Sequence, residues 1–313
     1  MTTVSQTRAL NNREIARAAI IVLLGFLASG VLGLVRTAVI AGTFGTGAAL
    51  DAFLAAQQIP ELIFVLVAGG ALGSSFIPVY ARLREHDDDT AAWRLASATM
   101  TLSALAAAVL GIVLALTAPL YIPLLMPDSA PEVQALAANL TRLMMVTPVI
   151  FAISGLIMGL LQAHQLFLLP SVAISMNNIG LMIGALIIAR MLPADTGIAQ
   201  VGGANVYGMA YGAILSALLH LAVQLPGLKQ IKAQLRLLPN WRVKGVMEVL
   251  RLMGPRVLGL AVVRVNFLVN IFFTSAMIEG SYTALYTAFT LMFFVLGVIG
   301  QSIGSAVFPS LAA

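Results

Sequence analysis

The sequence contains no cysteine and very little charge. Of its 313 residues, 0 are Cys and only 9% are Asp, Glu, Lys or Arg. Without cysteine the chain can form neither disulfide bonds nor thiolate-ligated metal sites. A soluble domain has about 25% charged residues. A chain this poor in charge cannot cover a globular surface in water, so the sequence does not fit a soluble domain.

Histidine and catalytic motifs are also scarce. The three histidines, His86, His164 and His220, are too scattered along the chain to suggest a metal cluster. The sequence has no GxSxG motif, no Walker loop and no HExxH motif. We therefore expect no enzyme, no metal site and no bound cofactor. Any transport would not be powered by ATP hydrolysis in this chain.

What the sequence does contain is a series of long apolar runs. Hydrophobic residues make up 60% of the chain, and the mean hydropathy is +0.99. The runs are too many for a signal peptide and lack the alternation of barrel strands. Because a helix needs about 20 residues to cross the hydrocarbon core, the sequence predicts an all-α polytopic membrane protein with about eight transmembrane helices. The predicted spans are 16–41, 50–81, 92–121, 131–162, 166–190, 202–225, 254–278 and 281–310.

Positive charge falls on alternate loops. Most of the 17 basic residues lie before the first span, between the second and third, or between the sixth and seventh, whereas the other loops hold only Arg190. Cytoplasmic loops carry an excess of Lys and Arg. The pattern predicts a multi-pass protein of the plasma membrane with a cytoplasmic N-terminus. It also accounts for the net charge of +5 without a nucleic-acid partner.

An internal similarity suggests one complete bundle and the start of a second. GSSFIPVYA (73–81) and GSAVFPSLA (304–312) share Gly, Ser, Pro and Ala at matching positions. Duplicated bundles are common in transporters, although chance similarity between apolar segments is the alternative. We expect a cytoplasmic segment at 1–15, a six-helix lobe at 16–226, a cytoplasmic linker at 227–253, and the first two helices of an incomplete second lobe at 254–313.

The linker contains a predicted amphipathic helix. The segment NWRVKGVMEVLRLMG (240–254) places apolar residues on one side and basic residues on the other. Asn240 would cap this helix, and Gly254-Pro255 would end it. Such a helix typically lies in the headgroup layer of a membrane.

Three arginines, Arg36, Arg142 and Arg264, fall inside predicted spans. An arginine in lipid costs at least ~2.5–3.5 kcal/mol, so we expect these side chains to face a protein interior or a wet cavity. Asp51 and Glu61 are the carboxylates available in the nearby spans, which leaves the interior net positive. Guanidinium groups bind phosphate by bidentate geometry, so the cavity suits an anionic cargo. Alternatively, Arg36 reaches the outer interface or pairs with Asp51.

Polar and helix-breaking residues mark the second and fifth spans. Pro60 removes a backbone hydrogen bond from the second span. With Gly69 and Gly70 it forms a candidate gate or hinge, and a static kink is the alternative. The candidate cavity-lining residues are Gln57, Asn177 and Asn178. For the two asparagines, the alternative role is a hydrogen bond between helices.

Several motifs along nearly the whole chain carry a resemblance to a known family. They are VLGLVRTAVIAGTFGTGAALDAF (31–53), IPELIF (59–64), AGGALGSSFIPVY (68–80), LTRLMMVTPVIF (140–151), LPSVAISMNNIG (169–180), MGPRVLG (253–259) and IGSAVFPSL (303–311). In these motifs the chain resembles the MurJ (MviN) family of lipid II flippases, in the multidrug/oligosaccharidyl-lipid/polysaccharide exporter superfamily.

The resemblance implies a fold of fourteen spans in two lobes around a central cavity. This chain would cover the first lobe and the first two helices of the second. The implied activity is transport of lipid II, an undecaprenyl-diphosphate-linked peptidoglycan precursor, across the bacterial inner membrane by alternating access. The resemblance implies that cavity arginines grip the diphosphate, and Arg36 and Asp51 match the family's motif. With Arg142 and Arg264, the other cations inside predicted spans, they are the candidate substrate-binding residues.

The resemblance also implies binding partners and a form of energy coupling. The partners would be an anionic lipid-linked oligosaccharide, membrane lipids and proteins of cell-wall synthesis. Coupling would be to a monovalent cation, a proton or the membrane potential rather than to a bound cofactor. The chain departs from the family pattern at Ser29-Gly30, Phe64-Val65 and Phe289-Thr290, where many members carry arginine nearby. The alternative is therefore a degenerate, non-transporting membrane scaffold or partner subunit of the same fold.

Overall fold

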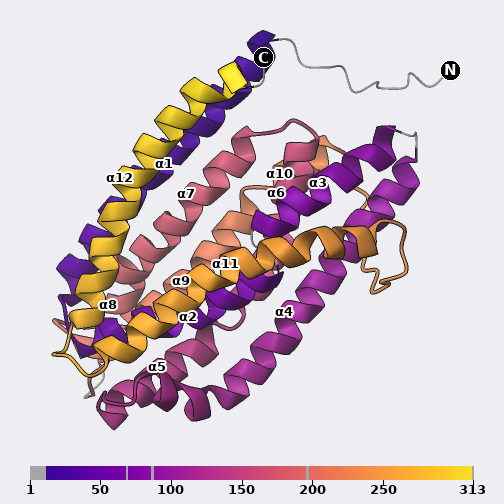
Figure 1. Ribbon diagram of the computed structural model, residues 1–313. Helices are drawn as coiled ribbons and strands as arrows, with labels where there is room; N and C mark the ends of the chain where they lie inside the picture. The colour runs from indigo at the N-terminus through magenta and orange to yellow at the C-terminus, as the bar shows by residue number, and fades with distance from the viewer. Residues whose placement is uncertain (1–11, 68–69, 86–87, 195–196, 312–313) are drawn as a thin grey trace.

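The computed structural model describes residues 12–67, 70–85, 88–194 and 197–311, and these are almost entirely helical (Figure 1). The helices are α1 (Asn12–Phe44), α2 (Ala48–Val67), α3 (Gly70–Glu85), α4 (Asp89–Leu125), α5 (Pro131–Met144), α6 (Thr147–Ala163), α7 (Leu168–Ile183), a π-helical turn η1 (Gly184–Ile188), α8 (Ala189–Met191), α9 (Tyr207–Ala222), α10 (Leu225–Gln230), α11 (Val246–Thr274) and α12 (Ser281–Leu311). Strands β1 (Gln200–Val201) and β2 (Ala204–Asn205) form a short antiparallel hairpin. The predicted all-α fold class is confirmed.

Seven helical segments of the described residues are long and apolar enough to cross a membrane. They are Leu27–Phe44, Ala48–Val67, Asp89–Leu125, Pro131–Ala163, Leu168–Met191, Tyr207–Gln230 and Val246–Thr274. Helix α12 corresponds to the eighth predicted span, and its Ser281–Gly297 portion is apolar as well. The chain is therefore a multi-pass membrane protein.

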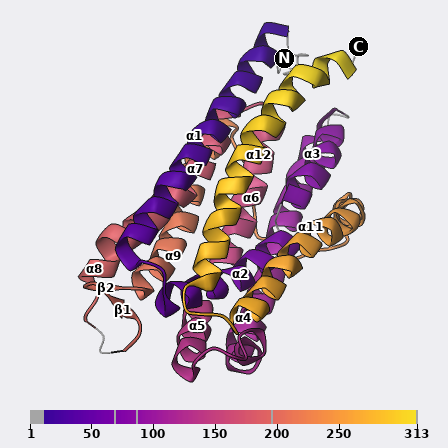
Figure 2. The same ribbon diagram turned by 60° about the vertical axis from the view of Figure 1, so that its left-hand side comes forward.

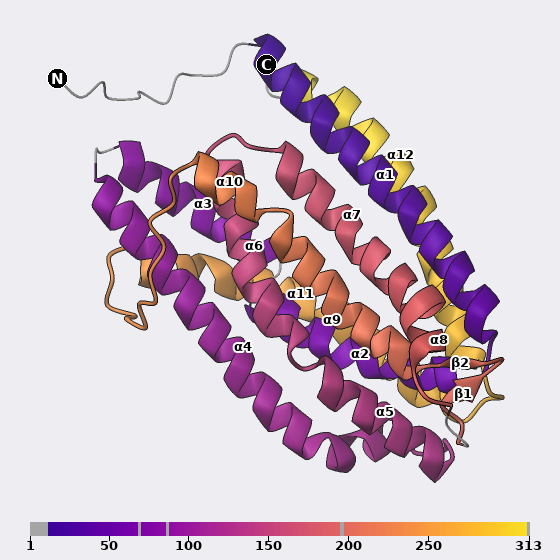
Figure 3. The same ribbon diagram turned by 180° about the vertical axis from the view of Figure 1, so that it is seen from behind.

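Helix α1 packs closely along α7, and α12 contacts α1, α2 and α11. Helices α1 and α12 lie side by side at one edge of the molecule, with α7 next to α1 (Figures 1 and 3). Helix α11 crosses the face of the molecule and packs on α2, α3 and α4. The α1–α2, α4–α5, α8–α9 and α11–α12 connections meet at one end of the molecule, and the α3–α4 connection and α10 lie at the other (Figures 1 and 2).

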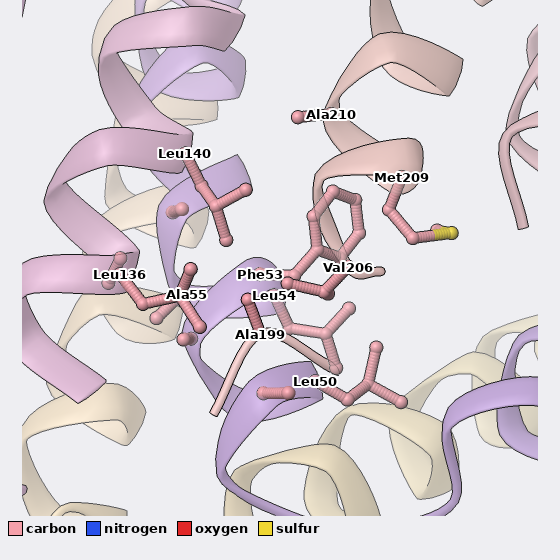
Figure 4. Packing of buried hydrophobic residues seen from close by; sticks show 14 of the residues in the cluster. Leu50, Phe53, Leu54, Ala55, Leu136, Leu140, Ala199, Val206, Met209 and Ala210 are labelled. Atoms are coloured by element: carbon pink, nitrogen blue, oxygen red, sulfur yellow. The ribbon is translucent and has the colours of Figure 1, made fainter. Parts of the chain in front are cut away.

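Two apolar clusters hold the helices together. The first surrounds the start of α2, where Leu50 and Phe53 pack against Leu140 of α5 and Met209 of α9 (Figure 4). The second lies at the opposite end and joins Tyr80 of α3 to α4, α6 and the start of α11. Both α2 and α11 contribute buried residues to each cluster, so each of these helices is fixed to its neighbours near both of its ends.

Small residues allow close contact between α7 and α9. A Cβ atom built on Gly180 would lie 2.4 Å from the Cα of Ser216, and one built on Gly184 would lie 2.6 Å from the Cα of Gly212. Helices in membranes associate mainly through such close packing, because lipid is as apolar as the helix surface. These glycines therefore set the spacing of the two helices.

Two predicted spans, 50–81 and 131–162, each consist of two helices. Helix α2 ends at Val67 and α3 begins at Gly70. Of the two predicted hinge glycines, Gly70 therefore starts a helix, and Gly69 lies outside the described residues. The predicted kink residue Pro60 lies within α2, and the helix continues through it. Helices α5 and α6 meet at Met145 and Val146, because Pro148, near the start of α6, has no backbone N–H to continue the preceding helix.

The predicted ends of the linker helix are wrong. Helix α11 begins at Val246 and continues through Gly254-Pro255 to Thr274. Asn240 does not cap this helix: its side-chain oxygen accepts a hydrogen bond from the backbone N–H of Arg242 at 2.9 Å. A transmembrane helix can pass through proline where neighbouring groups compensate for the lost hydrogen bond. Helix α11 thus runs through the predicted boundary between the cytoplasmic linker (227–253) and the second lobe (254–313).

Candidate functional site

The candidate site lies where α2 and α11 meet. Glu61 of α2 and Arg264 of α11 form an ion pair, and their side chains are 26% and 30% exposed. The side-chain N–H of Gln57, one turn before Glu61, donates to Glu61 Oε1 at 3.0 Å. The guanidinium therefore has a carboxylate partner, and both groups keep access to space outside the protein interior.

A polar cavity of about 180 Å³ opens beside this ion pair. Gln57, Glu61 and Arg264 line one side of it, and Asn177 of α7 lies on the lining as well. Its other polar lining residues are Thr147 and Ser216. The prediction that Gln57 and Asn177 line a cavity is consistent with this geometry.

Arg36 approaches the same region from α1. It lines a smaller cavity of about 30 Å³, and Gln57 and Leu181 line both cavities. Tyr286 of α12 lines the same smaller cavity as Arg36. The two arginines therefore lie on neighbouring parts of one inter-helix region.

Charge in this region is not balanced. Within the described ranges the ion pairs are Arg82–Glu248, Arg84–Asp89 and Arg264–Glu61, so no carboxylate there pairs with Arg36. Arg36 is partly buried, which makes an unpaired cation costly unless water or an anion reaches it. Two guanidinium groups and one carboxylate leave the site with a net positive charge.

Asp51 lies elsewhere and has a different environment from the one predicted. Its Oδ2 accepts a hydrogen bond from the Gly280 N–H at 2.7 Å, and its Oδ1 accepts from the N–H and the hydroxyl of Thr283 at 2.7 and 2.6 Å. These donors belong to the start of α12, where a helix has free N–H groups and a partial positive charge. Asp51 therefore ties α2 to α12, and the predicted alternative of an Asp51–Arg36 pair is not present.

Arg142 is also not brought to the cavity. Its side chain is exposed, its Nε donates to the carbonyl of Ala115 at 3.1 Å, and its Nη1 donates to Asn139 Oδ1 at 3.5 Å. The guanidinium satisfies a carbonyl of α4 on the outside of the helix group. Counting residues along the span gave its depth but not the face of the helix on which it lies.

The two asparagines of α7 have different environments. Asn178 is buried and donates to the carbonyl and the hydroxyl of Ser29 at 3.1 and 3.3 Å. It forms the helix–helix hydrogen bond that was one of its two predicted roles, whereas Asn177 lines the cavity. The sequence prediction missed Glu61 and Tyr286 as site residues. The only sequence signal for Glu61 was a carboxylate within an apolar span.

Comparisons with known proteins identify the family of this chain. A family model described as "Lipid II flippase MurJ" matches residues 40–313. The chain is 30% identical over 301 residues to the lipid II flippase MurJ of Burkholderia cenocepacia, with 94% of this chain and 56% of that protein covered. It is also 30% identical to a probable lipid II flippase MurJ of Synechocystis, with 88% and 53% covered. The chain thus spans about half the length of the curated relatives it matches.

Solved structures give the same fold. A lipid II flippase MurJ in an inward closed conformation matches with a TM-score of 0.71 at 21% identity, covering 92% of this chain and 57% of that one. A transporter of the MOP superfamily from Pyrococcus furiosus matches with a TM-score of 0.60 at 16% identity, covering 92% and 62%. At these identities the matches establish the helical transporter fold.

Proposed function

Because the chain belongs to the lipid II flippase MurJ family, we propose that it forms the first lobe, and the first two helices of the second lobe, of a flippase. The flippase moves an undecaprenyl-diphosphate-linked peptidoglycan precursor across the bacterial inner membrane by alternating access. The family is one of transporters, so no bond of the cargo is made or broken.

The single observation that carries this proposal is the positive region formed by Arg36 and Arg264. Both guanidinium groups lie beside cavities that share Gln57 and Leu181, and one carboxylate accompanies them. A diphosphate has several anionic oxygens, and arginine binds such groups through paired N–H donors. The net positive charge and the two guanidinium donors support binding of the diphosphate of a lipid-linked precursor.

Glu61 has a defined part in this mechanism. In the absence of cargo it is the anion that holds Arg264, with Gln57 fixing its other oxygen. A diphosphate entering the cavity competes with Glu61 for the same guanidinium. Exchange between an internal and an external anion lets the site release its cargo without leaving Arg264 unpaired, because the carboxylate returns to it.

Orientation and coupling are part of the same proposal. We place the N-terminus, the α3–α4 connection and α10 in the cytoplasm, because the loops at this end carry the basic excess typical of cytoplasmic loops. The opposite end, with the α11–α12 connection, faces outward. The driving force is an ion gradient or the membrane potential acting on the charged site.

Complementation tests this function directly. The full-length gene, expressed in a bacterium depleted of its own lipid II flippase, should restore growth and outer-leaflet lipid II. Arg36→Gln or Arg264→Gln each removes a charge-assisted contact worth about 1.5–3 kcal/mol, so transport should fall by about tenfold to 150-fold. Arg142→Gln is the matched control and should leave rescue intact, because Arg142 lies outside the cavity.

The second candidate function is a non-transporting scaffold of the same fold. It is favoured by the existing Glu61 partner of Arg264, since a neutralised arginine needs no cargo. Rescue that survives loss of both Arg36 and Arg264 would reject the diphosphate mechanism. Absence of rescue by the wild-type protein, at normal levels in the membrane, would favour the scaffold.

A further inference from the structure

An apolar groove separate from the charged site lies where α2, α4 and the start of α11 meet. Its volume is about 380 Å³. It is lined by Val67 at the end of α2, Leu102 of α4, Trp241 of the linker and Leu250 of α11. The other lining residues are Leu66, Thr99, Ser103, Ala106, Val246, Val249 and Met253.

The groove is open at the surface of the described residues. Trp241 and Leu250 are 57% and 46% exposed, although both line it. Further along α4, Leu105 and Val109 are exposed apolar side chains that continue from the groove toward the middle of the span. Tryptophan is enriched at the membrane–water interface. This order of side chains fits a groove with one end at the headgroup layer and the other in the hydrocarbon.

The headgroup end of the groove is positively charged. The Arg242 guanidinium lies 5.6 Å from the centre of the Trp241 ring, close enough for a cation–π interaction. Lys244 and Arg251 are exposed on the same segment. The one nearby carboxylate on α11, Glu248, already pairs with Arg82 at 2.5 Å. The rim of the groove therefore attracts an anion.

Size limits what can occupy the groove. One helical turn is about 10 Å across and 5.4 Å long, so it fills roughly 400 Å³ before its neighbours are counted. A cavity of about 380 Å³ has roughly the volume of one helical turn, and its mainly apolar lining suits part of a flexible hydrocarbon chain. An anionic lipid matches both the apolar groove and its positively charged rim.

We propose that this groove binds an anionic phospholipid of the membrane. One acyl chain lies among Leu102, Leu250 and Val67, and the phosphate of the headgroup contacts Arg242, with Lys244 and Arg251 nearby. Because the groove joins α4 to α11, the bound lipid fills the space between the first bundle and the helix that leads out of it. This site is independent of the diphosphate site at Arg264, which lies further along α11.

Native mass spectrometry of the full-length protein tests the proposal. Detergent-purified protein is incubated with phosphatidylglycerol or phosphatidylcholine of identical acyl chains, and with a polyprenyl phosphate. We expect phosphatidylglycerol to be retained at least about tenfold better than phosphatidylcholine. Leu102→Trp fills the groove and should remove most of this retention. Leu116→Trp is the matched control, because Leu116 is 73% exposed elsewhere on α4, and retention should be unchanged.

A second pair of substitutions tests the basic residues at the headgroup end separately from the apolar groove. The double substitution Arg242→Gln and Arg251→Gln should abolish the preference for phosphatidylglycerol while leaving weak retention of both lipids. A phosphatidylglycerol with a photoactivatable acyl chain, applied to the wild-type protein, should label peptides around Leu102 and Leu250. Labelling elsewhere, equal retention of the two phospholipids, or preferential retention of the polyprenyl phosphate at this groove would each overturn the proposal.

Discussion

Replacement of Glu61 by glutamine is the change that most sharply separates an anion-binding cavity from a structural ion pair. The substituted amide would keep the shape of the side chain and an oxygen that can accept the hydrogen bond from Gln57. It would remove the only carboxylate that pairs with Arg264 within the described residues. If the cavity binds a diphosphate, Arg264 becomes free for the cargo; if the pair only joins α2 to α11, the substitution merely weakens the fold.

The size of the effect follows from the exposure of the pair. A hydrogen bond to a charged group contributes about 1.5–3 kcal/mol, and each 1.4 kcal/mol changes an equilibrium constant about tenfold. Side-chain exposures of 26% and 30% place this pair at the lower end, because solvent screens part of the attraction. We therefore expect Glu61→Gln to tighten binding of a diphosphate lipid by about tenfold.

The assay is binding of a polyprenyl diphosphate to the purified full-length protein, with neutral polyprenol as the control ligand. Glu132→Gln removes one exposed carboxylate far from the cavity and should leave the affinity unchanged. Arg264→Gln should weaken binding by about tenfold. If Glu61→Gln leaves the affinity unchanged or lowers it while Arg264→Gln weakens binding as expected, the competition between Glu61 and the cargo is refuted.

Three further predictions concern stability. Asp51→Asn should lower the free energy of unfolding by about 2 kcal/mol, since the carboxylate accepts three hydrogen bonds at the start of α12. The control Asp128→Asn, at an exposed site, should not change the thermal unfolding curve. Gly180→Val should lower the free energy of unfolding by about 1–3 kcal/mol, because a Cβ there would lie 2.4 Å from the backbone of α9. In the control Gly42→Val the added Cβ meets nothing within 4 Å, so this variant should unfold like the wild type. Burial, with the nearby Arg84 cation, lowers the pKa of His164 to about 4, below its ordinary value of 6.5. The unfolded chain then binds the extra proton, so stability should fall as the pH drops from 6.5 toward 4, and His164→Phe should flatten this dependence in thermal unfolding across the same range.

The transmembrane spans were predictable because the bilayer fixes their length. A run of about 20 apolar residues is required wherever a helix crosses. Helix breaks were less predictable, since they depend on local backbone groups rather than on hydropathy. The break between α5 and α6 did have a local signal in Thr147-Pro148, where proline favours the first turn of a helix. Gly254-Pro255 has the same kind of signal, yet α11 continues through it.

The site could be predicted only in part. Arg36 and Arg264 were identifiable because a cation in a span needs a polar environment. Glu61 was one of two available carboxylates, but its pairing with Arg264 could not be predicted, because the two residues are 203 apart in sequence and meet only when α11 crosses α2. Asp51 was assigned from its motif to the substrate, whereas its contacts with Gly280 and Thr283 depend on where the loop before α12 comes to lie. The predicted repeat and the two-lobe division remain predictions.

The most direct test of the central claim is a structure of the full-length protein with a polyprenyl diphosphate bound. The account predicts diphosphate oxygens within hydrogen-bond distance of both Arg36 and Arg264, with Glu61 displaced from the guanidinium it now holds. A diphosphate bound elsewhere, with the Glu61–Arg264 pair intact, would contradict it.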